Sequence, residues 1–91
     1  MLTMRMIGQN DYSVREDDQP IGRIRFAHER TPGVWLWNVQ VTFPGPPLLG
    51  SAGSLDNAKV NFTKAWERFK EFHGPNRLAK AYAAMNLRNE P

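Results

Sequence analysis

The feature that most constrains the fold is the strict alternation of the segment from Gly33 to Phe43, which reads GVWLWNVQVTF. Successive side chains of a β-strand point to opposite faces of a sheet. A strand over about residues 34–43 therefore has one polar face interrupted by a leucine and one wholly apolar face, formed by Trp35, Trp37, Val39, Val41 and Phe43.

Two shorter segments before this strand alternate in the same way. Residues 12–16 and 21–28 each separate apolar from polar positions, and residues 17–20 (DDQP) between them favour a turn. These segments predict a β-hairpin, and with residues 34–43 they predict a three-stranded antiparallel sheet. Residues 1–10 also alternate, at Leu2, Met4 and Met6, and fit either an extra edge strand or a frayed end.

The second half of the chain has helical periodicity. The proline-rich residues 43–50 predict a connection that is neither a central strand nor a helix, and residues 50–54 a flexible lead into an N-cap at Ser54. The apolar positions that follow form one helical stripe: Leu55, Ala58, Phe62, Ala65, Trp66 and Phe69.

Gly74 and Pro75 predict the end of this helix and the start of a second, shorter one. Residues 86–91 predict a frayed tail. We therefore expect a single α+β domain over residues 1–91, with a three-stranded antiparallel sheet packed on one long helix and a short C-terminal helix.

The composition excludes several kinds of site. The chain has no cysteine, which rules out a disulfide scaffold, a thiol nucleophile and cysteine-ligated metals. Only two histidines are present and no catalytic motif is recognisable, so we expect no enzymatic activity, catalytic residues, metal site or cofactor. The sequence shows neither a transmembrane run nor a signal peptide, and we expect a cytoplasmic protein without membrane contact.

Trp35 and Trp37 have two interpretations. They could form a platform on which nucleic-acid bases stack, or they could pack in the core against Phe62, Trp66 and Phe69. The alternation along the strand favours the core.

The polar face of the predicted sheet is the more interesting candidate surface. Arginine suits guanine edges and phosphates, and asparagine or glutamine suits adenine. The candidate nucleic-acid-binding residues are Arg15, Arg23, Arg25, Asn38 and Gln40, with Leu36 as a possible interface residue at their centre. Three interpretations remain open: a solvated outer face, a nucleic-acid-binding surface, and a homodimer formed through this face or through an exposed edge strand. The net charge of +3 is compatible with all three.

A recurring pattern adds a resemblance over about residues 12–69. Its elements are IGRI at 21–24, WLW at 35–37, Gly50 and Ala52, and a helical AK..F..AW at 58–66. The chain resembles in these positions a family of short proteins of soil alpha-proteobacteria, of rhizobial type, that carries no known activity or site. The order of strands and helix also resembles the plant AP2-type DNA-binding domain, in architecture alone. We therefore expect a small non-enzymatic interaction module whose partner is another protein or a second copy, with a nucleic-acid-binding domain as the alternative.

Overall fold

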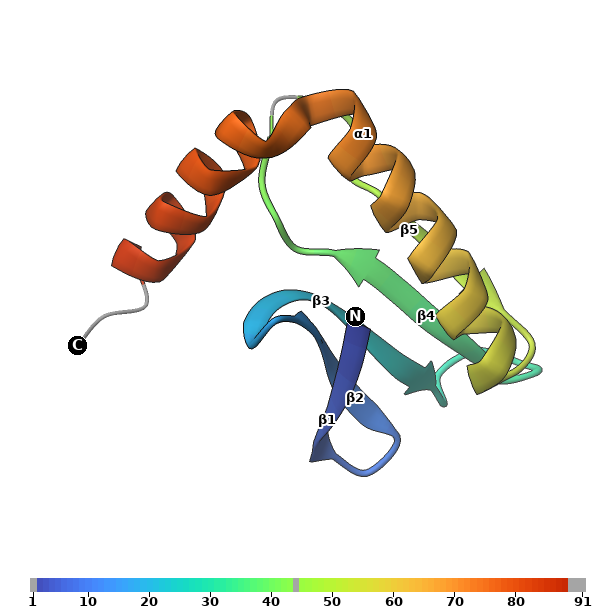
Figure 1. The fold of residues 1–91 in the computed structure, drawn as a ribbon. Helices are drawn as coiled ribbons and strands as arrows, with labels where there is room; N and C mark the ends of the chain where they lie inside the picture. Colours follow the sequence, from blue (N-terminus) through green and yellow to red (C-terminus); the bar gives the residue numbers. More distant parts are fainter. Residues whose placement is uncertain (1, 44, 89–91) are drawn as a thin grey trace.

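Five antiparallel strands in chain order form one sheet, and a kinked helix follows them (Figure 1). The computed structural model describes residues 2–43 and 45–88. The strands are β1 (Leu2–Gly8), β2 (Asp11–Glu16), β3 (Gln19–Ala27), β4 (Val34–Val39) and β5 (Leu49–Ala52), and the helix is α1 (Leu55–Arg88). The predicted α+β class and antiparallel sheet are confirmed.

The predicted number of three strands is wrong, because a strand is added at each edge. Residues 2–8 form the edge strand β1, whose pairing with β2 buries part of Leu2 and Met4. β5 lies where a flexible lead was expected. It pairs with β4 so that Gly50 is opposite Trp37 and Ala52 is opposite Trp35. The small residues leave room for the indole rings: a Cβ on Gly50 would come within 2.6 Å of the Trp37 ring.

The helix begins as the sequence indicates and continues further than expected. The hydroxyl of Ser54 accepts a hydrogen bond from the backbone N–H of Asn57 at 3.1 Å, which confirms the N-cap. Within the described residues, no separate C-terminal helix follows. Gly74 interrupts α1 with φ 78° and ψ 165°, and the chain then continues as a second limb of the same kinked helix. Residues 86–88 of the predicted frayed tail are helical, and residues 89–91 lie outside the described part of the chain.

The core lies between the sheet and α1, as the alternation predicts. α1 packs against β3, β4 and β5. Phe62 and Trp66 of the helix are fully buried, and Trp35 and Trp37 of β4 pack against that cluster. The Trp37 and Phe62 rings meet edge to face, with centroids 6.1 Å apart. Trp35 and Trp37 therefore pack with the helix side chains, as the core interpretation of the alternation predicts.

The second limb of α1 closes the core at the β2–β3 turn. Leu78 is buried, and Tyr82 packs beside it. Burial, together with the charges of Glu16 and Asp17, raises the pKa of Tyr82 to about 12. The side chains of Asn86 and Gln19 exchange two hydrogen bonds, at 3.0 and 3.3 Å. These contacts hold the limb against the hairpin.

Candidate functional site

The sheet face opposite α1, which we term the outer face, collects the polar positions of neighbouring strands. Arg23 of β3 is paired with Asn38 of β4, and Arg25 is paired with Leu36. Arg15 of β2 lies on the same face, opposite Thr3 of β1. The arginines, Asn38 and Leu36 are half-buried, and Thr3 is exposed. The structure therefore places four of the five candidate nucleic-acid-binding residues on adjacent strands, with Leu36 among them.

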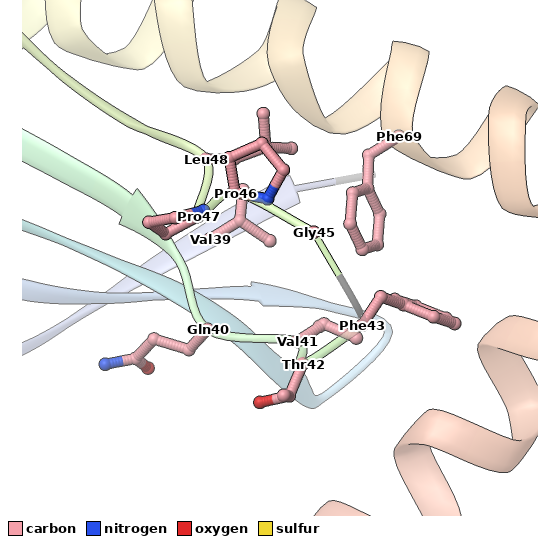
Figure 2. Close-up of a pocket in the computed structure, with 10 residues that line it drawn as sticks. All are labelled: Val39, Gln40, Val41, Thr42, Phe43, Gly45, Pro46, Pro47, Leu48 and Phe69. Carbon is pink, nitrogen blue, oxygen red and sulfur yellow. The ribbon is translucent and has the colours of Figure 1, made fainter.

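Gln40 lies just beyond the end of β4, and its side chain continues the alternation between the two faces of the sheet. Its backbone N–H donates to the carbonyl of Ile21 at 2.8 Å, which continues the pairing with β3 for one residue. Figure 2 shows the side chains of Gln40 and Thr42 pointing away from α1. Gln40 therefore also belongs to the rim of the outer face.

The three candidate arginines of this face are held by partners within the chain. Arg23 donates two hydrogen bonds to the carboxylate of Asp11, one of them at 2.8 Å from Nε. Arg25 forms an ion pair with Glu29 at 3.1 Å. Arg15 donates to the backbone carbonyl of Asp18 at 2.7 Å and thereby braces the β2–β3 turn.

These ion pairs shift the carboxyl groups toward the ionised form. The hydrogen bonds from Arg23 hold the pKa of Asp11 below its ordinary value, against the opposing effect of burial. Asp11 raises the pKa of Arg23 in turn. Glu29 has a lowered pKa because of a hydrogen bond to its own backbone and the bond from Arg25. Both carboxylates are therefore charged near neutral pH and neutralise two of the arginines.

An open hollow of about 260 Å³ lies on the outer face between β3, β4 and β5. Two leucines contribute to its apolar part: half-buried Leu36, and Leu49, which is 63% exposed. Trp37 and Gly50 also line it, and arginines and amides form the rest: Arg23, Arg25, Arg30, Asn38 and Gln40. The hollow thus unites four of the five candidate nucleic-acid-binding residues, without Arg15, and the candidate interface residue.

The sequence pattern alone does not identify Leu49 and Arg30 as residues of the outer face. Leu49 is paired with Asn38 across β4 and β5, so its side chain follows the outer face. The sequence does carry a signal: Leu49 and Ser51 alternate with the small Gly50 and Ala52, which leave room for the two tryptophans. Arg30 belongs to the loop between β3 and β4, whose path over the hollow has no local sequence signature.

A second recess lies between α1 and the segment that leaves β4 (Figure 2). It has a volume of about 200 Å³, and its described lining carries no charged side chain. Next to it Phe72 of α1 is 79% exposed beside a hollow of about 330 Å³ that Pro46, Leu48 and Phe69 also line. This region can bury apolar atoms, and Arg68 and His73 add polar groups to the lining of the second hollow.

The described residues include no group of three or more histidine, cysteine, aspartate or glutamate side chains placed to hold a metal ion. Within the same residues, no helix has the length and apolarity needed to cross a membrane. Comparison of the chain with protein-family models, curated proteins and solved structures finds no match.

Proposed function

We propose that this chain is a small non-enzymatic interaction module that binds another protein through the outer face of its sheet. The observation that carries this proposal is the hollow in which Leu36 and Leu49 lie among three arginines, two of which, Arg23 and Arg25, are already paired with carboxylates. Protein interfaces commonly combine an apolar centre with arginine and a polar rim. The hollow would fit a partner that inserts an apolar side chain between the two leucines and places carboxylates or carbonyls against the arginines and amides at the rim.

The alternative is a nucleic-acid-binding domain that uses Arg15, Arg23, Arg25, Asn38 and Gln40 on the same face. Their arrangement on adjacent strands favours this alternative, because an antiparallel sheet can enter the major groove. Two features argue against it. Arg23 and Arg25 would have to exchange Asp11 and Glu29 for phosphates or bases, and the leucines at the centre have no polar partner to offer a base edge.

Capture from a nuclease-treated lysate of the native cell tests the protein proposal. We expect the wild-type chain to retain a specific protein. The Leu49→Asp variant should retain less of that protein, by about tenfold or more, because the change puts a charge in the apolar centre. Leu87→Asp is the matched control, since Leu87 is exposed on the second limb of α1. Retention that is equal for both variants would contradict the proposal.

A titration with fluorescent duplex DNA at two salt concentrations tests the alternative. Phosphate-driven binding by several arginines would lose affinity steeply between about 50 and 200 mM salt, and an Arg15→Ala, Arg23→Ala double variant would lower the slope. The protein proposal predicts no saturable binding even at low salt. Tight, salt-dependent binding would decide for the nucleic-acid alternative.

A further inference from the structure

The edge strand β1 leaves one row of backbone N–H and C=O groups without a strand beside it among the described residues, since the sheet order places β2 on its other side only (Figure 1). The other edge, β5, has four residues, whereas β1 has seven. Proteins usually protect such edges with proline, lysine or a very short strand. β1 has no proline or lysine, its one charged residue is Arg5, and its pairing with β2 is irregular only at its end, between Met6 and Gly8.

The side chains of β1 are unusually apolar for an edge. Met6 is 64% exposed and Ile7 is 56% exposed. Leu2 and Met4 are half-buried and line a hollow of about 150 Å³ between β1 and α1, together with Phe62 of the helix. An additional strand beside β1 would cover these groups and pair its free backbone.

We propose that β1 pairs antiparallel with β1 of a second copy of this chain, about a two-fold axis at Met4. An antiparallel pair related by a two-fold axis keeps each face of the sheet continuous, so directly opposed residues must come from the same face. This condition leaves two registers with extensive pairing: one centred on Met4 and one centred on Arg5. The second places two guanidinium groups directly opposite each other, which is destabilising.

The register centred on Met4 avoids that repulsion. It places Arg5 opposite Thr3 of the partner subunit, and Leu2 opposite the partner's Met6. The flexible Met6 side chain of each copy then lies within reach of the hollow beside Leu2 and Met4 of the other. Apolar groups meet on the α1 side and polar groups on the outer side. The strand is thus self-complementary, which is the property that an interface between two identical copies requires.

This pairing goes beyond the proposed function and gives it a geometry. Because each face stays continuous, both outer faces would lie on the same side of one joined sheet. The two hollows would then form part of a single surface, and a partner with two matching sites would gain from binding both. The proposal on the outer face does not require the dimer, so each can fail alone.

Single-cysteine variants test the register directly, because the chain has no cysteine of its own. Opposed residues have Cβ atoms about 4.5–5.5 Å apart, so Met4→Cys should form a disulfide-linked dimer under mild oxidation. Met6→Cys is the matched control: the two Met6 positions would be about 13 Å apart, so this variant should not cross-link alone despite its greater exposure. Mixed with Leu2→Cys, it should form the cross-linked pair. Cross-linking that is strongest in Arg5→Cys or in Met6→Cys alone would overturn the register.

Light scattering over a range of concentrations tests the dimer itself. We expect a wild-type mass that rises toward twice 10.4 kDa, and a Met6→Lys variant whose dissociation constant is raised about tenfold or more, because an apolar contact is replaced by a charge. Leu87→Lys and Leu49→Asp should both still dimerise. A wild-type chain that stays monomeric throughout, or a Met6→Lys variant that dimerises as well as the wild type, would overturn the proposal.

Discussion

Gly22 lies where the helix comes closest to the sheet. A Cβ at this position would overlap the ring of Phe62 and the backbone oxygen of Asn38. The absent side chain is therefore what allows the largest helix residues to rest on β3. The neighbouring Ile21 is also fully buried. The pairing of β2 and β3 is irregular at this residue, because Val14 is opposite Gly22 and Arg15 is opposite Pro20.

Gly22→Ala should lower the free energy of unfolding by roughly 1–3 kcal/mol, because overpacking forces the helix or β4 to move. Urea denaturation measures the effect. Gly53→Ala is the control, since a Cβ on Gly53 meets nothing within 4 Å, and it should leave the midpoint nearly unchanged. Equal midpoints for the two variants would show that the close approach at Gly22 is not tight.

His73 is the titratable residue most closely surrounded by aromatic rings. Its ring stacks on Phe43 at 3.9 Å between centroids and lies 4.5 Å from Phe69. Its Nδ1 is buried and has no hydrogen-bond partner among the described residues. Burial, and then the charge of Arg77, lower the pKa of His73 below its ordinary value of 6.5. Aromatic contacts, and not a hydrogen bond to Nδ1, therefore hold this ring among the described residues.

This pKa shift predicts a pH dependence of stability. The unfolded chain binds a proton at His73 more readily than the folded chain, so the folded state is favoured above pH 6.5 and loses stability as the pH falls through the lower folded value. Thermal unfolding between pH 7.5 and about 5 measures the trend. His73→Phe should weaken it, whereas His28→Gln should retain it because His73 is unchanged. A His73→Phe profile that matches the wild type would contradict this assignment.

At the scale of elements, the kink in α1 determines how the helix encloses the core. The first limb covers β3, β4 and β5, and the second limb turns toward the β2–β3 hairpin, where Asn86 bonds Gln19 (Figure 1). Gly74 makes this possible because its φ of 78° and ψ of 165° fall in a region that is essentially restricted to glycine. Lys70 adds an ion pair with Glu16 at 2.8 Å that joins the first limb to β2.

Gly74→Ala should therefore lower the free energy of unfolding by about 1–3 kcal/mol, or straighten the helix and release the second limb. Urea denaturation reports the first outcome, and an increase in the radius of gyration in small-angle scattering reports the second. Asn76→Ala, at an exposed helical position, is the control. A variant with unchanged stability and dimensions would show that the kink does not depend on glycine.

The elements with strong periodicity could be predicted from the sequence, and those formed by pairing could not. The alternation from Trp35 onward placed β4 correctly on its two faces, and the helical stripe placed α1. β4 ends at Val39, four residues before the alternation does, because the proline-rich segment turns the chain away from β3. β5 contains no β-branched or aromatic residue, and its glycine, Gly50, is a residue that strands usually lack. Pairing with β4 decides its conformation, which local sequence does not encode.

At the scale of the whole molecule, the two faces of the sheet differ in what they contact. The α1 side buries the aromatic residues Phe62 and Trp66, and the outer face is the surface through which we propose that the chain binds a partner. The sequence could assign Arg23, Arg25 and Asn38 to that face by alternation alone. It could not show that Asp11 and Glu29 neutralise Arg23 and Arg25, because these pairs depend on the registers of β2 and β3 and on a loop. On that neutralisation we base the proposal of a protein partner in place of nucleic acid.

Photo-crosslinking in the native cell tests the proposal that the outer face binds a protein. A photoreactive residue at Leu49 lies on the outer face, and one at Val60 lies exposed on α1 as its matched control. We expect a nuclease-resistant, protease-sensitive adduct from position 49, heavier than two copies of the chain, and no such adduct from position 60. A nuclease-sensitive adduct at position 49, or the same protein adduct from both positions, would contradict it.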